Sequence, residues 1–187
     1  MSIIKHLLYF ICFGTFLLSA QKKTLNIQQS TMKWTGKQIT SKTHYGSLKF
    51  KSGDVLFKDG LISKGKFIVD MTSLLVEDLQ GENKGKLEGH LKSDDFFSID
   101  KFEESSLIIS NSSKIPNGVN ASGTLTIKGL SHPIDFKILK KGDSWLGSLI
   151  FDRSKYNVQF RSGNFFENLG DKLILDFIKI ETTLSFN

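Results

Sequence analysis

Most of the chain after residue 30 alternates apolar and polar side chains with a period of two, and this alternation restricts the fold more than any other feature. Successive side chains of a β-strand point to opposite faces of a sheet, so the pattern predicts strands with one buried and one solvated face. Residues 121–128 (ASGTLTIK) are a clear case, with Leu125 and Ile127 on one face and threonines on the other. The chain is therefore expected to be all-β.

Turn signals divide this part of the chain into eight or nine strands. Asp59 and Gly60 favour a hairpin because both turn positions tolerate positive φ angles, and residues 116–118 and 141–143 mark further turns. The expected strands span residues 31–40, 43–50, 53–57, 61–71, 105–110, 121–128, 134–139, 144–152 and 172–186. Tight turns predict an antiparallel meander, and closure into a barrel is favoured because it removes exposed sheet edges.

Residues 82–102 (ENKGKLEGHLKSDDFFSIDKF) interrupt the alternation. Leu87 and Leu91 are four residues apart, so one helical turn directs both leucines inward. Each of the glycines that precede them disfavours a helix by about 1 kcal/mol, so the helix is expected to begin near Lys86. The aromatic pair Phe96 and Phe97 follows directly. A short helix ending in two aromatic residues predicts a lid over one end of the barrel.

The first twenty residues have the parts of a secretory signal peptide. Lys5 gives a basic start, residues 7–18 are apolar, and small residues favour cleavage after Ala20. Residues 1–20 are therefore predicted as a signal peptide and residues 21–187 as one barrel domain in the periplasm or outside the cell. A retained membrane anchor is the alternative. The only cysteine, Cys12, lies in this segment, so the mature domain has no disulfide and depends on its core.

Charge and motifs argue against several function classes. Without Lys5 the domain has 24 basic and 19 acidic residues, and nearly all of the positive charge is scattered lysine. A nucleic-acid-binding surface clusters its charge and favours arginine, so no nucleic-acid partner is expected. Contact with an anionic membrane surface and a homodimer are both left open. The chain lacks known catalytic motifs and metal-ligand spacings, so we expect no enzyme, no metal site and no cofactor.

A long connection at residues 154–170 (SKYNVQFRSGNFFENLG) separates the last two predicted strands. It carries Phe160, Phe165 and Phe166. Long aromatic loops inside compact domains are usually functional or pack over a barrel mouth. We therefore expect Phe165 and Phe166 to help close the barrel together with the pair that follows the helix.

Arg153 and Arg161 are the only arginines. Arg153 directly precedes this connection, and Arg161 lies within it. Both are expected near the barrel mouth, where a guanidinium group suits a phosphate or carbonyl head group better than lysine does. The alternative for Arg153 is a structural ion pair with Asp152 or another carboxylate.

Several motifs resemble the YceI-like family of exported, lipocalin-type barrel proteins. The matching motifs are residues 90–97 (HLKSDDFF), 123–129 (GTLTIKG), 151–154 (FDRS) and 165–172 (FFENLGDK). One difference is Glu103, where the family usually has a proline. The resemblance implies an eight-stranded antiparallel lipocalin-like barrel with one short helix over an end. It also implies that the interior binds a long isoprenoid chain, such as a polyprenyl or quinone-like lipid.

Apolar residues on inward faces and in the two non-strand segments are candidates for lining such a site. An isoprenoid tail offers only carbon, so its site needs apolar walls, and each buried methylene contributes about 0.8 kcal/mol. The candidate lipid-binding residues are Phe67, Val69, Met71, Leu91, Phe96, Phe97, Leu125, Ile127, Phe136, Phe151, Phe160, Phe165 and Phe166. The expected function is an exported carrier that sequesters an isoprenoid-type lipid. The alternatives are a filled barrel acting as a structural or protein-interaction module, and a hydrolase or isomerase on the same scaffold.

Overall fold

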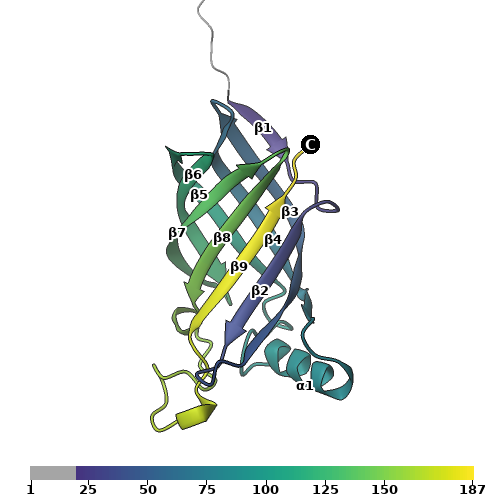
Figure 1. Ribbon diagram of the computed structural model, residues 1–187, viewed down its shortest axis with the longest axis vertical. Helices are drawn as coiled ribbons and strands as arrows, with labels where there is room; N and C mark the ends of the chain where they lie inside the picture. Colours follow the sequence, from purple (N-terminus) through teal and green to yellow (C-terminus); the bar gives the residue numbers. More distant parts are fainter. Residues whose placement is uncertain (1–19) are drawn as a thin grey trace, which may run out of the picture.

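The computed structural model describes residues 20–187, so the predicted signal peptide lies outside the described residues except for Ala20. The strands are β1 (Gln21–Thr24), β2 (Thr31–Lys37), β3 (Thr43–Lys58), β4 (Leu61–Val76), β5 (Glu104–Ile115), β6 (Gly118–Ile127), β7 (Leu130–Lys141), β8 (Ser144–Asp152) and β9 (Phe177–Leu184). Helix α1 (Gly81–Lys92) lies between β4 and β5 (Figure 1). Two short 3-10 helices, η1 (Arg153–Tyr156) and η2 (Gly170–Lys172), lie between β8 and β9.

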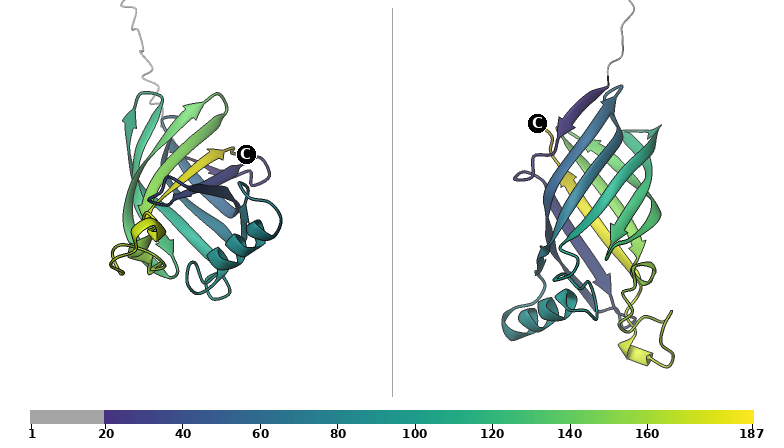
Figure 2. Two further views of the ribbon diagram at one scale, coloured as in Figure 1. Left: turned by 60° about the horizontal axis from the view of Figure 1, so that its bottom comes forward. Right: turned by 180° about the vertical axis from the view of Figure 1, so that it is seen from behind.

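The strands form one antiparallel sheet that closes into an eight-stranded barrel (Figures 1 and 2). Strands β1 and β2 pair with different halves of the long strand β3, so together they occupy one position of the barrel. Pairing of β2 with β9 and of β3 with β4 completes the ring. The predicted all-β barrel with one short helix is confirmed. Closure leaves few unpaired backbone groups at sheet edges.

Most strand bounds differ from the expected ones: β4, β5 and β7 are longer than predicted, and three further differences concern β3, β9 and β1. Strand β3 joins two predicted strands into one strand of 16 residues. Its pairing with β4 is irregular, with register shifts between Ser47 and Lys49 and between Phe50 and Ser52. Strand β9 begins at Phe177 rather than at residue 172, and β1 was not expected because it is short and polar. Such bulges are invisible to a strict period of two.

Helix α1 begins at Gly81, five residues earlier than expected. Ion pairs between Lys86 and Glu82, 2.6 Å, and between Lys84 and Glu88, 3.7 Å, stabilise its first turns. The Glu88 carboxylate also accepts a hydrogen bond from the backbone N–H of Val76, 2.8 Å, which ties the helix to the end of β4. These contacts offset the low helix propensity of the glycines. Within residues 20–187 no helix is long and apolar enough to cross a bilayer.

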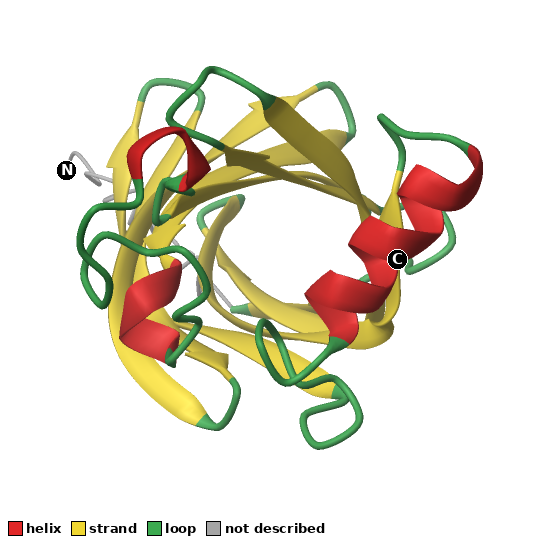
Figure 3. Cartoon of the chain, turned by 90° about the horizontal axis from the view of Figure 1, so that it is seen from below, coloured by secondary structure: helices red, strands yellow, loops and turns green. Residues whose placement is uncertain are grey.

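The two ends of the barrel differ in what they contain. The closed end, as we call it, carries the β3–β4, β5–β6 and β7–β8 turns and the C-terminus (Figure 1). Its interior is filled by side chains that are at most 4 % exposed: Leu25, Val55, Ile62, Val119 and Trp145. The helix end carries α1, the β2–β3 turn and the β8–β9 connection (Figure 3). The packed part of the interior therefore lies at the closed end.

Candidate functional site

A cavity of about 560 Å³ occupies the barrel between the closed end and the helix end. Small-molecule sites in proteins commonly measure about 300–1,000 Å³. The wall is built from inward-facing side chains of β2 to β9, because alternation places every second residue of each strand inside. Exposed residues of the β2–β3 turn and of α1, among them Lys42 and Lys86, also border the cavity, so it opens at the helix end.

Eleven of the thirteen candidate apolar residues line this cavity: Phe67, Val69, Met71, Leu91, Phe96, Phe97, Leu125, Ile127, Phe136, Phe151 and Phe160. Strands β4, β6, β7 and β8 supply most of them. Leu91 is the one fully buried residue of α1, and Phe96 and Phe97 are also buried. The structure thus collects these residues around one space, and their contact with a lipid stays a prediction.

Phe165 and Phe166 do not line the cavity, contrary to expectation. Their side chains are 44 % and 48 % exposed. The backbone N–H groups of both residues donate to the carbonyl of Ser162, at 3.1 and 3.0 Å, and this turn holds the two rings outside the barrel. They are therefore placed to contact something external.

Phe160, rather than Phe165 or Phe166, is the aromatic residue of the β8–β9 connection that lines the cavity. Its ring centroid lies 4.3 Å from the imidazole of His90 on α1 in an edge-to-face arrangement. His90 in turn lies 5.8 Å from Phe96, which packs against Phe97 at 5.0 Å. The aromatic contacts join the β8–β9 connection to α1 across the helix end. Aromatic residues thus meet at the helix end, but Phe160 takes the place that the sequence predicted for Phe165 and Phe166.

Further lining residues were not among the candidates: Met32, Trp34, Leu48, Phe50, Leu74, Leu79, Leu87, Leu107, Ile138, Leu149, Ile174, Leu175, Ile178, Ile180 and Leu184. The alternation already contained the signal for several of them. Ile178, Ile180 and Leu184 share one face of β9, but apolar residues on both faces of its sequence hid that pattern. Ile174 and Leu175 lie outside any strand, so no period could have identified them.

His90 is a half-buried polar residue in this apolar lining. Burial lowers the pKa of its imidazole, and the nearby positive charge of Arg161 lowers it further, while Asp95 acts in the opposite direction. Within residues 20–187 its Nε2 atom has no hydrogen-bond partner, although it is shielded from solvent. A neutral imidazole packed between aromatic rings is consistent with this environment.

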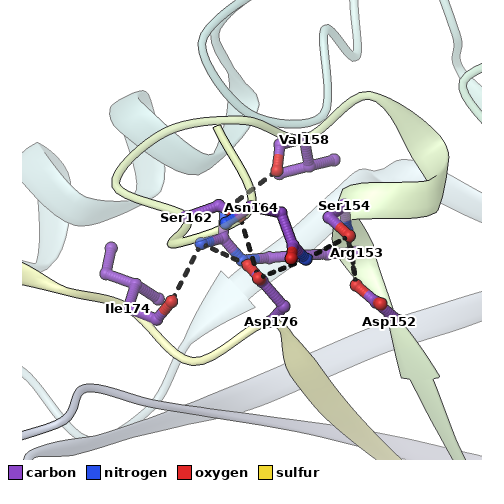
Figure 4. A network of polar contacts seen from close by, with 8 residues as sticks. All are labelled: Asp152, Arg153, Ser154, Val158, Ser162, Asn164, Ile174 and Asp176. Carbon is purple, nitrogen blue, oxygen red and sulfur yellow. Dashed lines mark hydrogen bonds and ion pairs between the residues drawn. The ribbon is translucent and has the colours of Figure 1, made fainter. Parts of the chain in front are cut away.

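Arg153 is an anchor for the β8–β9 connection (Figure 4). Its side chain is completely buried, and its Nη2 atom lies 3.0 Å from Oδ1 of Asp176. Nη1 donates to the carbonyl of Val158 at 3.1 Å, and Nη2 donates to the carbonyl of Ile174 at 3.2 Å. The structural alternative therefore describes Arg153 better than the head-group role, and its carboxylate partner is Asp176 rather than Asp152. Asp152 instead caps η1 by accepting from the N–H of Ser154, 2.9 Å.

Arg161 also lines the cavity. Its guanidinium lies 4.9 Å from the ring centroid of Phe160 and, unlike that of Arg153, it forms no ion pair with any residue in the described range 20–187. Lys37, Lys42 and Lys86 also border the cavity, which contains no aspartate or glutamate among its described lining residues. The mouth is therefore positively charged while the interior is apolar. No group of three or more potential metal ligands occurs within residues 20–187.

Solved structures of similar fold include three bacterial proteins. BcnA of Burkholderia cenocepacia is 19 % identical, with a TM-score of 0.67 over 86 % of this chain and 98 % of its own. A polyisoprenoid-binding domain of Saccharophagus degradans, implicated in plant cell wall breakdown, is 12 % identical, with a TM-score of 0.56 over 88 % and 97 %. The YceI protein of Campylobacter jejuni is 19 % identical, with a TM-score of 0.50 over 67 % and 73 %. At these identities the likeness establishes the fold.

Sequence comparison identifies the family. No curated protein matches the chain in sequence. The YceI-like domain, in contrast, matches residues 24–186, which is nearly all of the part that the structure describes. That match begins at the last residue of β1 and ends after β9, so it includes β2 to β9 and α1. The chain therefore belongs to the YceI-like family, as its motifs indicated.

Proposed function

We propose that this protein is an exported carrier that sequesters an isoprenoid-type lipid in its barrel, and that it acts by binding rather than by catalysis. The observation that carries the proposal is the cavity of about 560 Å³, whose wall is apolar and whose mouth lies at one end. An apolar tail in this space exchanges water for close carbon contacts, at about 0.8 kcal/mol per methylene. The same space argues against the alternative of a barrel filled by its own side chains.

The comparisons support a lipid ligand. The Saccharophagus degradans domain of the same fold is described as polyisoprenoid-binding. The predicted signal peptide at residues 1–20 supports export to the periplasm or beyond. The family match and the absence of catalytic motifs in the sequence support a binding role.

The mouth favours a ligand whose head group accepts hydrogen bonds and carries negative charge. Arg161, Lys37 and Lys42 border the mouth, and none of them has an ion-pair partner among residues 20–187. A guanidinium group binds phosphate oxygens with two parallel hydrogen bonds, whereas a neutral quinone offers isolated carbonyls. Arg161 is therefore the head-group residue in this proposal, and Arg153 supports it indirectly by fixing the connection.

Native mass spectrometry of the protein purified from its own cell envelope tests the proposal. We expect a retained lipid of several hundred daltons, and uptake of added polyprenol or polyprenyl phosphate by protein that has been stripped of lipid. Arg161→Gln should weaken binding of the phosphate but not of the polyprenol, and Lys64→Gln on an exposed strand position is the matched control. An empty protein that takes up neither lipid would overturn the carrier function and favour the structural module.

A further inference from the structure

Large apolar side chains are exposed mainly at one end of the molecule. Ile39, Ile150, Phe165, Phe166 and Phe177 are between 44 % and 66 % exposed, and all five belong to the helix end. Single exposed hydrophobic residues are normal on protein surfaces, but several gathered on one side indicate an interaction site. We call these five residues the apolar rim.

The apolar rim adjoins the cavity mouth. The backbone N–H of Ile39 donates to the carbonyl of Leu173 at 3.0 Å, so the β2–β3 turn lies against the β8–β9 connection. Ile39 follows Gln38, which lines the cavity, and Phe165 follows the turn that begins after Arg161. Figures 1 and 2 show that this connection projects beyond the strands at the helix end. A flat apolar surface that met the rim would also meet the mouth.

Ile150 and Phe177 extend the rim along the outside of the barrel. Phe177 pairs with Asp152 at the first position of β9, and Ile150 pairs with Lys179 two positions farther along. They therefore lie diagonally across β8 and β9 on the outer face, next to the helix end. Phe177 is the most exposed large apolar side chain, at 66 %.

The closed end has no such cluster. Its three hairpin turns contain Asp59 and Gly60, Asn117, and Gly142 and Asp143. Its exposed large apolar residues are Ile27 and Leu139, at 42 % and 40 %, on different elements. The exposed apolar surface therefore distinguishes one end of the barrel from the other.

The charge of the two loops at the rim complements an anionic surface, whereas residues 77–103 on the α1 side of the helix end carry eight acidic and four basic side chains. Residues 37–42 and 154–172 carry five basic side chains, Lys37, Lys42, Lys155, Arg161 and Lys172. They carry two acidic side chains, Glu167 and Asp171. Cationic residues beside exposed aromatic ones are typical of segments that bind the interface of an anionic bilayer.

We propose that the β2–β3 turn and the β8–β9 connection form a membrane-docking surface on their side of the helix end: Phe165, Phe166 and Ile39 enter the lipid interface while the neighbouring lysines contact anionic head groups. This orientation places the cavity mouth against the bilayer. Docking itself follows from the exposed rim and its charge, whereas its use for loading or unloading a lipid rests on the proposed function. Binding is expected to be reversible, because a few side chains insert rather than a spanning segment.

Flotation with vesicles that hold no isoprenoid tests docking separately from the cavity. We expect the mature protein to float with phosphatidylcholine vesicles that contain about one third phosphatidylglycerol, and to do so less at high salt. The double variant Phe165→Ser/Phe166→Ser should bind about tenfold more weakly. The matched control Ile27→Ser/Leu139→Ser removes two exposed apolar residues from the closed end and should float like the wild type. Equal flotation of both double variants, or none by the wild type, would overturn docking.

Two further measurements separate this proposal from the carrier function. The Phe165→Ser/Phe166→Ser protein should take up polyprenyl phosphate to the same extent as the wild type but acquire it from vesicles more slowly. Leu125→Trp, which narrows the cavity, should take up less lipid and keep flotation. Normal flotation by a protein that never binds lipid would leave docking standing and overturn the carrier. If the wild type forms a dimer that Phe165→Ser/Phe166→Ser abolishes, the rim is a self-association surface and docking is wrong.

Discussion

Arg153 at the end of β8 and Asp176 just before β9 form a buried ion pair, with 3.0 Å between Nη2 and Oδ1. The other carboxylate oxygen of Asp176 accepts hydrogen bonds from Ser162, 2.8 Å, and Asn164, 3.0 Å (Figure 4). One carboxylate thus joins both ends of the long connection to its middle. The loop that carries Phe160 and Arg161 to the cavity mouth depends on this pair.

Arg153→Ala should destabilise the fold by about 3–5 kcal/mol, because it leaves the Asp176 carboxylate and two carbonyls without their buried donor. Urea unfolding followed by tryptophan fluorescence measures the change. Arg161→Ala is the matched control and should cost less than about 1 kcal/mol, since its side chain is half-buried and forms no ion pair within residues 20–187. Similar losses for both arginines would contradict the anchoring role of Arg153.

Leu125→Trp should weaken lipid uptake and leave the free energy of unfolding within about 1 kcal/mol of the wild type. Leu125 is 7 % exposed and faces the cavity, so the larger ring has space that a packed core would not provide. Native mass spectrometry and urea unfolding check the two parts. Val119→Trp at the filled closed end is the comparison, and should destabilise by about 1–3 kcal/mol. Equal destabilisation at both positions would mean that the cavity is not available space.

His90 should make the protein less stable in mild acid. Burial holds the folded pKa of His90 below its ordinary value of 6.5, so between these two pKa values the unfolded chain binds more protons than the folded one. The free energy of unfolding therefore falls as the pH drops below 6.5 toward the folded pKa. Two nearby charged groups also act on this pKa: Asp95 raises it and Arg161 lowers it.

Urea unfolding of the wild type and His90→Gln from about pH 7.5 to about pH 5.5 isolates this contribution. We expect the wild type to lose more stability than the variant across that interval. An NMR titration of the His90 imidazole should give a pKa below 6.5. Parallel stability profiles would show that burial does not perturb this histidine.

Replacement of two glycines by alanine should change the stability of the protein in opposite directions. A Cβ on Gly123 would lie 1.9 Å from the carbonyl oxygen of Ile108 across the β5–β6 pairing, so Gly123→Ala should destabilise by about 1–3 kcal/mol. A Cβ on Gly85 in α1 would meet no atom within 4 Å, so Gly85→Ala should stabilise by about 0.5–1 kcal/mol. Thermal unfolding measures both. A loss of stability for Gly85→Ala would mean that the helix needs glycine at that position.

Local patterns were sufficient for the barrel and for much of its interior. Leu125 and Ile127 were assigned inward because side chains alternate along a strand, and both line the cavity. Leu87 and Leu91 were assigned to one helix face by their spacing, and both border the cavity. The predicted start of α1 was wrong because helix propensity takes account of the glycines alone. It does not include the ion pairs and the hydrogen bond from Val76 that hold the first turns.

The sequence by itself determined an all-β antiparallel meander of eight or nine strands, since a period of two and turn residues are properties of neighbouring positions. The resemblance of its motifs to the YceI-like family implied the eight-stranded barrel. Only the tertiary structure decided that Arg153 is an anchor while Arg161 faces the mouth, and that Phe160 lines the cavity while Phe165 and Phe166 point outward. It also decided that the interior has unfilled space. These outcomes depend on which distant segments meet and on how much volume the ring of strands encloses, and no local pattern records either quantity.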